Sequence, residues 1–233
     1  MLLIYRSHTQ EQKKTTLKNI TLSIDKGERV CISGVGGSGK TTFINAMAGM
    51  YTEFDGSVTY NKYSLRDLDR VHLRDMIGKN VSIDDIFEGT IVDNVLVGKP
   101  LLEDTDAIHA IELVGLQHQI NSLPDGLHTQ IMSAGKGFSK SFIQRLILAR
   151  CIAKKPNILI LNNFFESFSK SERMELIYML TKQDKPWTLL VCSNDPLIIS
   201  ACDRTVYLED GQVIADGPSE EILQIDEVVE NLN

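Results

Sequence analysis

The sequence predicts an α/β protein with a mainly parallel sheet. Short apolar runs suited to buried strands alternate along the chain with stretches of helical periodicity, and this alternation is typical of parallel sheets. The runs at residues 29–33, 158–161 and 187–192 are largely apolar, as strands covered on both faces are.

The other strands are expected to be short or to lie at edges. Residues 2–5 form a short apolar run that fits an edge strand. Residues 20–24 alternate between apolar and polar positions, as a half-buried strand does, and residues 57–60 follow an Asp-Gly turn signal. Residues 205–215 are expected to form an antiparallel hairpin around a second Asp-Gly turn.

Helical periodicity accounts for much of the remaining chain. Five segments space their apolar residues for one face of a helix, namely residues 42–49, 91–97, 104–114, 141–153 and 171–181. Ser169 or Ser171 would cap the last of these, because a serine hydroxyl accepts a hydrogen bond from a free N–H group of the first turn. Pro218 and Ser219 would open a final short helix.

Composition limits the classes of protein to which the chain can belong. Its 233 residues can form one domain, or one domain with a subdomain. A net charge of −7 does not favour a nucleic-acid partner. No run of about 18 apolar residues occurs, so no membrane-spanning helix is expected. The four cysteines lie in apolar surroundings and are expected to be buried, reduced thiols.

The clearest functional signal is the glycine-rich stretch from Gly34 to Thr41, which matches the pattern G-x-x-x-x-G-K-[ST]. It lies between a predicted strand and a predicted helix. Glycines let successive N–H groups converge on one anion, and the helix N-terminus adds partial positive charge. Lys40 would reach the β- and γ-phosphates of a nucleotide, and Thr41 would bind Mg²⁺. The candidate nucleotide-binding residues are Gly34, Val35, Gly36, Gly37, Ser38, Gly39, Lys40, Thr41 and Thr42.

Further motifs occur in a recognisable order around this loop. They are Leu17-Lys18-Asn19-Ile20, Phe87-Glu88-Gly89-Thr90-Ile91, Gln144-Arg145-Leu146-Ile147-Leu148-Ala149-Arg150, Cys202-Asp203-Arg204 and Gly211-Gln212-Val213-Ile214. This order resembles the nucleotide-binding domain of ATP-binding cassette (ABC) transporters over nearly the whole chain. The Glu-Gly-Thr-Ile turn is most similar to that of exporter-type cassettes.

The resemblance implies a P-loop NTPase core with a mainly parallel sheet, small antiparallel strands and an inserted helical subdomain. In a single domain of residues 1–233, residues 1–80 and 152–233 would build the sheet-containing core, and residues 81–151 the helical subdomain. The implied cofactors are ATP and Mg²⁺. The implied partners, at the cytoplasmic face of a membrane, are a transporter's transmembrane domain and a second nucleotide-binding domain, identical or different. Tyr5 would stack on adenine, as in the family, or simply pack in its strand.

The signature motif of the family is altered here. Where Leu-Ser-Gly-Gly-Gln is expected, the chain has Phe138-Ser139-Lys140-Ser141-Phe142. In the family this motif meets the nucleotide of the partner domain, so Ser139 and Lys140 are the candidate contacts to the partner's nucleotide. Both glycines are missing, and a Cβ obstructs the close approach of backbone to phosphate. Lys140 would either contact phosphate or remain solvated.

The acids expected at the catalytic centre are also absent. Family strands end in Asp-Glu, where Asp orders Mg²⁺ and Glu polarises the attacking water, but here the strand ends in Asn162-Asn163. Asn162 and Thr41 remain candidate metal ligands through neutral oxygens, whereas Asn163 cannot take up a proton. A simpler interpretation is that both asparagines merely terminate the strand.

Three other positions agree with a vacated catalytic site. The family's switch histidine falls on Asn194, its glutamine on Ser82 or Ile83, and the aspartate of its dimer-contact loop on Ser169. The losses lie on separate segments, so chance is a poor explanation for all of them. They predict a chain that keeps the phosphate-binding half of the site and lacks the hydrolytic half.

Three functions remain open at this point. The first is a domain that binds Mg·ATP and couples binding and dimerisation to a transmembrane domain, with hydrolysis weak or lost. The second is an active ABC transporter ATPase that drives export. The third is an unrelated P-loop kinase or GTPase, although Asn61-Lys62-Tyr63-Ser64 lacks the aspartate that a guanine-specific motif requires.

Overall fold

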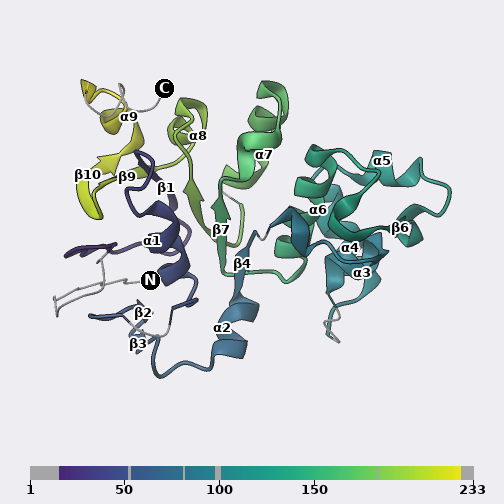
Figure 1. The fold of residues 1–233 in the computed structure, drawn as a ribbon, viewed down its shortest axis with the longest axis horizontal. Helices are drawn as coiled ribbons and strands as arrows, with labels where there is room; N and C mark the ends of the chain where they lie inside the picture. Colours follow the sequence, from purple (N-terminus) through teal and green to yellow (C-terminus); the bar gives the residue numbers. More distant parts are fainter. Residues whose placement is uncertain (1–15, 52–53, 81, 98–100, 183, 227–233) are drawn as a thin grey trace.

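The computed structural model describes residues 16–51, 54–80, 82–97, 101–182 and 184–226 (Figure 1). Its centre is a six-stranded sheet in the order β10-β9-β1-β8-β7-β4. The strands are β1 (Arg29–Gly34), β4 (Ile77–Lys79), β7 (Ile158–Asn162), β8 (Thr188–Cys192), β9 (Arg204–Glu209) and β10 (Gln212–Pro218). All neighbours are parallel except β9 and β10, which form the predicted hairpin. The predicted fold class is therefore confirmed.

The central strands are buried on both faces because both faces of the sheet carry apolar side chains. Leu159 on β7 is paired with Leu189 on β8, and both belong to the core on one face of the sheet. The next pair, Ile160 and Leu190, belongs to the core on the opposite face. This alternation is the period of two that a strand imposes, and it gives each face its own hydrophobic core.

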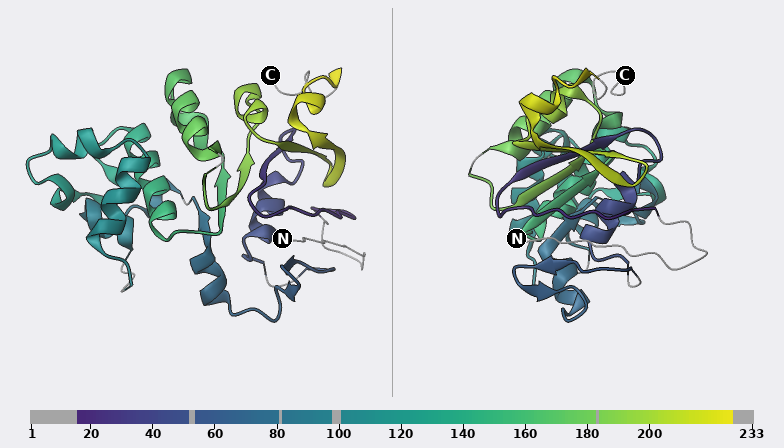
Figure 2. Two further views of the ribbon diagram at one scale, coloured as in Figure 1. Left: turned by 180° about the vertical axis from the view of Figure 1, so that it is seen from behind. Right: turned by 90° about the vertical axis from the view of Figure 1, so that its left-hand side faces the viewer.

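Helices cover both faces (Figure 2). Helix α1 (Lys40–Met47) packs on one face together with residues 17–24. Helices α6 (Lys140–Ala153), α7 (Lys170–Thr181) and α8 (Pro196–Ser200) contribute to the core of the other face. The short helix α9 (Ser219–Ile222) follows β10 and packs on Tyr207 of β9.

Most of the chain between β4 and β7 builds a mostly helical region, drawn in teal beside the sheet in Figure 1. Its elements are η1 (Ile83–Asp85), β5 (Gly89–Thr90), α3 (Ile91–Leu96), α4 (Asp104–Leu113), α5 (Gln117–Asn121), η2 (Gly126–His128), β6 (Gln130–Ile131) and η3 (Ser133–Gly135). Strands β5 and β6 pair in antiparallel fashion, and α3 and α4 pack against α6. Helix α6 is thus shared between this region and the sheet, and one continuous apolar core joins them.

Small elements complete the described chain. Strands β2 (Thr59–Tyr60) and β3 (Tyr63–Ser64) form a short antiparallel pair. Helix α2 (Arg70–Met76) leads directly into β4, and η4 (Phe164–Ser167) follows β7.

Some predicted boundaries shift for identifiable reasons. Residues 20–24 bury alternate side chains as expected, but they belong to no strand among the described residues, so their burial comes from side-chain packing on the α1 core. The strand predicted at residues 57–60 is limited to Thr59–Tyr60. Helix α1 begins at Lys40 because Gly39, with a left-handed φ, acts as its N-cap. The predicted edge strand at residues 2–5 lies outside the described residues.

Two compositional predictions can be compared with the structure directly. All four cysteines are free and buried, as expected. Among the helices of the described residues, none is both long enough and apolar enough to cross a membrane.

Candidate functional site

The phosphate loop, residues 34–41, is held in shape by a glycine near each end. Gly34 ends β1 with a φ of +140°, and a Cβ at this position would lie 2.0 Å from the carbonyl oxygen of Leu208. Gly39 has a φ of +101° and packs so closely that a Cβ would lie 2.8 Å from the Leu17 side chain. Glycine is the residue that accepts both the left-handed φ and the close approach. The two ends of the loop are therefore packed closely, one against Leu208 of β9 and the other against Leu17.

The middle of the loop offers free donors to an anion. Within the described part of the chain, the N–H groups of Gly36, Gly37 and Lys40 have no backbone acceptor. Gly36 and Gly37 are exposed, and a Cβ added at either would meet no atom within 4 Å. Converging N–H groups at a helix N-terminus form the kind of nest that binds phosphate.

The side chain of Lys40 folds back across the loop. Its ammonium donates to the carbonyl oxygen of Gly34 and, at 2.9 Å, to that of Val35. Burial lowers the pKa of Lys40, because desolvation disfavours the charged form. A polyphosphate bound in the loop would offer this cation stronger, charged acceptors than the two carbonyls.

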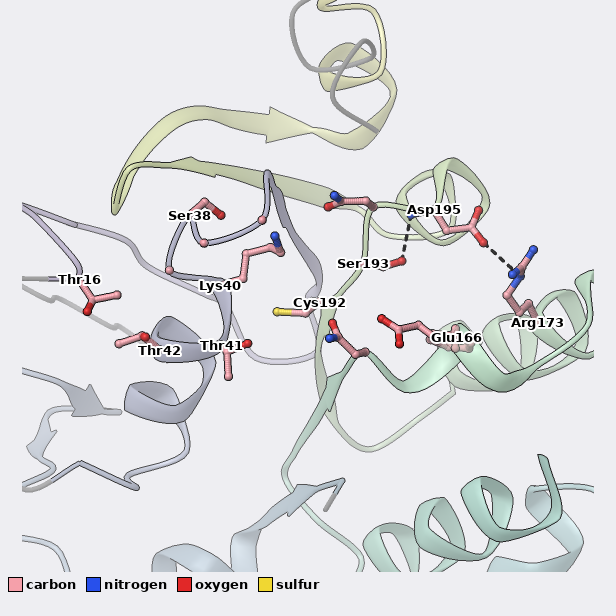
Figure 3. A pocket seen from close by; sticks show the side chains of 16 residues that line it. Thr16, Ser38, Lys40, Thr41, Thr42, Glu166, Arg173, Cys192, Ser193 and Asp195 are labelled. Carbon is pink, nitrogen blue, oxygen red and sulfur yellow. Dashed lines mark hydrogen bonds and ion pairs between the residues drawn. The ribbon is translucent and has the colours of Figure 1, made fainter. Parts of the chain in front are cut away.

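The loop forms one wall of a cleft of about 730 Å³ (Figure 3). Residues 36–42 line the cleft on this side, and Asn163, Cys192 and Asn194 line the side formed by the ends of β7 and β8. The carboxyl ends of parallel strands meet at one edge of a sheet, which is where open α/β proteins bind ligands. The structure thus brings most of the predicted nucleotide-binding residues together with two of the vacated catalytic positions, Asn163 and Asn194.

Asn194 is bonded to the phosphate loop itself. Its Nδ2 donates to the carbonyl oxygen of Gly34 at 3.0 Å, and its Oδ1 accepts from the Gly34 N–H at 3.2 Å. The Ser33 hydroxyl donates to the same Oδ1 at 3.0 Å. The carboxamide therefore links the end of β8 to the end of β1, and both its oxygen and its nitrogen are bonded within the chain.

A second asparagine carboxamide, that of Asn80, bonds both backbone groups of a residue on another strand, here Asn162 at the end of β7. Asn80, which follows β4, donates from Nδ2 to the carbonyl oxygen of Asn162 at 2.9 Å. Its Oδ1 accepts from the Asn162 N–H at 2.7 Å. Asn80 thus holds the backbone of Asn162, and the Asn162 side chain is left free for another partner.

The residues proposed for Mg²⁺ fit a hard cation with neutral oxygen ligands. Thr41, at the start of α1, lines the cleft. The Oδ1 atom of Asn162 is buried and has no hydrogen-bond partner, which is unusual for a buried polar atom and suits a metal-bound water. In the described residues no cluster of three or more His, Cys, Asp or Glu could hold a metal by itself. Mg²⁺ would therefore be held mainly by water and by phosphate oxygens.

The other predicted site residues lie in different places. Asn163 has a left-handed φ of +48° and is the N-cap position of η4, at the wall of the cleft. Ser139 caps α6 by accepting from the Phe142 N–H at 3.1 Å, and Lys140 is exposed on its first turn. Neither Ser139 nor Lys140 lines the cleft. Tyr5 lies outside the described residues.

Ser169, and Ser82 as one of the two candidates for the glutamine position, each cap a helix. Ser82 is the N-cap of η1, and Ser169 is the N-cap of α7. Each forms a capping box, in which the side chain of the third helical residue returns a hydrogen bond to the cap. Ser169, and not Ser171, is thus the cap of α7.

The cleft also contains charged residues that sequence reasoning missed. They are Glu166 on η4, Arg173 on α7 and Asp195 just before α8. Asp195 lies directly after Asn194, so its nearness to the phosphate loop could have been inferred from the sequence. Arg173 gives no such signal, because a solvated charge on a helix face is the ordinary interpretation. Glu166 lies three residues after Asn163, and only the conformation of η4 reveals where its carboxylate points.

Known proteins with similar sequences are ATP-binding transport proteins by name. A protein-family model described as ABC transporter matches residues 17–165. A multidrug export ATP-binding/permease protein, so named, from Staphylococcus aureus strain COL is 29% identical over 207 residues, which cover 89% of this chain and 36% of the relative. Its counterpart in the bovine strain RF122 is 28% identical over the same shares. The chain thus spans about a third of the length of these relatives.

A solved structure agrees with the fold. The structure of a bacterial Atm1-family ABC exporter with ATP bound matches with a TM-score of 0.87 and 20% sequence identity. The match covers 98% of this chain and 40% of that chain. At this level of identity the match shows a shared fold.

Proposed function

Because the chain belongs to the ABC transporter family, we propose that it is the ATP-binding domain of an exporter. It binds Mg·ATP in the cleft beside the phosphate loop and couples binding to a transmembrane domain, while its own hydrolysis is weak or lost. The observation that carries the proposal is the contrast between the two walls of the cleft. One wall offers Lys40 and backbone N–H groups that have no backbone acceptor in the described chain, and the other offers Asn163, where the family has a carboxylate, and Asn194, where it has a histidine.

The binding half rests on the loop. The free N–H groups of Gly36, Gly37 and Lys40, the N-terminus of α1 and the Lys40 ammonium all favour a polyphosphate. Bound Mg²⁺ would neutralise phosphate charge, and Thr41 and Asn162 would orient its water ligands. Tyr5 remains the candidate for stacking on adenine.

The weak hydrolysis rests on the opposite wall. A carboxamide at Asn163 can hold a water by hydrogen bonding but cannot accept its proton. The Asn194 oxygen and one of its two N–H groups are engaged by Gly34 and Ser33, so only one neutral N–H remains for a γ-phosphate, where the family has a histidine. Loss of a general base typically costs about 10²–10⁴-fold in rate.

Coupling to a transmembrane domain is proposed for the helical lobe, residues 81–151. The relatives carry an ATP-binding and a permease part in one chain according to their names, and this chain spans only about a third of their length. The turn at Phe87 that precedes β5 is the expected contact, and it is held firmly. Buried Asn94 bonds both the N–H and the carbonyl of Phe87, at 3.2 and 3.0 Å, and Arg150 donates to Asn94.

The second proposed partner is another ATP-binding domain, identical or different, at the cytoplasmic face of the membrane. Ser139 and Lys140 lie at the N-terminus of α6, away from the chain's own cleft. An exposed lysine at a helix N-terminus has no favourable interaction with the helix dipole, and an anion from another chain would provide one. This supports Ser139 and Lys140 as contacts to the partner's nucleotide.

The test combines binding and turnover on the same preparation of the whole chain. Calorimetric titration with Mg·ATP is expected to show saturable binding, and phosphate release is expected to be slow. The double variant Asn162→Asp/Asn163→Glu should bind similarly and turn over faster, by up to about 10²-fold for a restored base. Rapid turnover by the unaltered chain would instead support the active ATPase, and no binding at millimolar Mg·ATP would overturn the proposal.

A further inference from the structure

Two carboxylates line the cleft, and only one of them is engaged. Asp195 accepts from the Leu197 N–H at 3.0 Å as the N-cap of α8, and its other oxygen is ion-paired with Arg173 Nε at 3.1 Å. Glu166 also lines the cleft, but within the described part of the chain it has no hydrogen-bond or ion-pair partner. It is the acid of this cleft that is free to act on a ligand.

The position of Glu166 relates it directly to Asn163. It lies three residues further along, in η4. Both residues line the same cleft, and Figure 3 shows the Glu166 side chain extending from η4 toward Cys192 and the phosphate loop.

The segment that carries Glu166 is anchored on both sides. Phe164, Phe165 and Phe168 are each 4% exposed or less. The ring of Phe164 lies 5.1 Å from that of Phe165 and 5.2 Å from that of Phe168, centroid to centroid. Packed rings fix the backbone between them, so Glu166 is attached to a rigid turn at the wall of the cleft. A fixed point of attachment keeps the carboxylate within a limited distance of a bound ligand.

We propose that Glu166 is a catalytic residue, the general base for the slow hydrolysis that this chain retains. The Glu166 carboxylate, three residues after Asn163, thus takes the place of the carboxylate that Asn163 lacks. In the reaction, the oxygen of a water bonds to the γ-phosphorus and the bond to the β–γ bridging oxygen breaks. ADP leaves, and the proton of the water passes to a carboxylate oxygen of Glu166 and then to solvent. The inference rests on the proposed function, since it requires ATP in the cleft.

The decisive variant is Glu166→Gln, which keeps the shape of the side chain and removes its ability to take a proton. Phosphate release by the whole chain is expected to fall by about 10²-fold. Affinity for Mg·ATP is expected to stay the same or improve, because a negative charge near the phosphates is removed. Glu166→Asp should keep part of the rate, and Glu220→Gln on the exposed face of α9 should change neither quantity.

A pH profile separates catalysis from a structural effect. The rate of the unaltered chain should fall as the pH is lowered, and the rate of Glu166→Gln should lose that dependence. Equal turnover in Glu166→Gln and the unaltered chain, or no turnover by a chain that binds Mg·ATP, would overturn this inference and leave the proposed function standing. Absence of binding would remove both.

Discussion

The carboxamide of Asn194 and the backbone of Gly34 are joined by two hydrogen bonds, of 3.0 Å and 3.2 Å. The pair connects the end of β8 to the first residue of the phosphate loop. The residue at the position of the family's switch histidine thus positions the loop in this chain. It is a positioning residue, and changing it should alter binding before it alters chemistry.

Asn194→Ala is therefore expected to weaken both the fold and the site. The three hydrogen bonds of Asn194 are worth about 1 kcal/mol each, and solvent will replace part of that, so a loss of about 2 kcal/mol is expected. For a chain of this size the Tm should fall by roughly 4–8 °C. Affinity for Mg·ATP, measured by titration, should fall by about tenfold. An unchanged Tm would show that the pair does not hold the loop.

Asn194→His should fail to restore hydrolysis. A carboxamide accepts from the Gly34 N–H and donates to the Gly34 carbonyl with two atoms that share one carbon. The ring nitrogens of an imidazole cannot reproduce this pair of bonds, so the Tm should fall as in Asn194→Ala. Phosphate release should not rise. A faster rate with an unchanged Tm would contradict this.

Lys40→Met should abolish most of the affinity for nucleotide. Hydrogen bonds to charged groups are worth about 1.5–3 kcal/mol, so the loss of this cation should weaken Mg·ATP binding by about 10–100-fold. Lys26→Met, in an exposed turn, removes the same charge away from the cleft and is the matched control. Titration of both variants distinguishes a specific contact from a general effect of net charge.

Asn94→Ala should destabilise the chain strongly. Asn94 is fully buried, and its side chain bonds the backbone of Phe87 twice and that of Thr90 at 3.1 Å. Removing the Asn94 carboxamide leaves buried backbone groups without hydrogen-bond partners, which costs about 2–4 kcal/mol of stability. Thermal unfolding should show a clear drop in Tm, whereas Asn121→Ala, at an exposed position, should show almost none.

One exposed pair should make stability depend on pH. His72 Nδ1 lies 2.8 Å from Asp69 Oδ2; the carboxylate raises the pKa of His72, and the histidine lowers the pKa of Asp69. The raised pKa contributes stability that is fully present below pH 6.5 and is lost as the pH rises through the folded pKa of His72. The contribution from Asp69 is fully present above pH 3.8 and is lost as the pH falls through the lowered folded pKa of Asp69. His72→Gln should therefore lower the Tm at pH 5.5 and leave it nearly unchanged at pH 8.5.

Much of the fold could be predicted from the sequence because local patterns determine it. The apolar runs of β1, β7 and β8, the Asp210-Gly211 turn and the spacing of α6 each carry their structure within a few residues. Residues 20–24 show the limit of this reasoning. Their alternation correctly predicted which side chains are buried, but they belong to no strand within the part of the chain that the structure describes, and the backbone partners of a strand are not specified by the segment's own residues.

The residues of the site could be predicted only where they lie together in one sequence motif. The phosphate loop is contiguous, so its residues could be named in advance. The bonds from Asn194 to Gly34 and from Asn80 to Asn162 join residues 160 and 82 positions apart, and no local pattern reports them. The place of Glu166 in the cleft depends on the 3₁₀ conformation of η4, which the packing of its phenylalanines imposes.

Helix α6 has a consequence for how such a chain would work. Ser139 caps one end, Arg145 in the middle donates to the carbonyl of Val114 at 2.6 Å, and Arg150 near the other end donates to that of Asn94 at 2.7 Å. Side chains of this one helix are therefore hydrogen-bonded to two separate elements of the helical lobe, the end of α4 and α3. If a second ATP-binding domain docks at Ser139 as proposed, a shift of α6 would be passed through Arg150 to Asn94, whose side chain bonds the turn at Phe87.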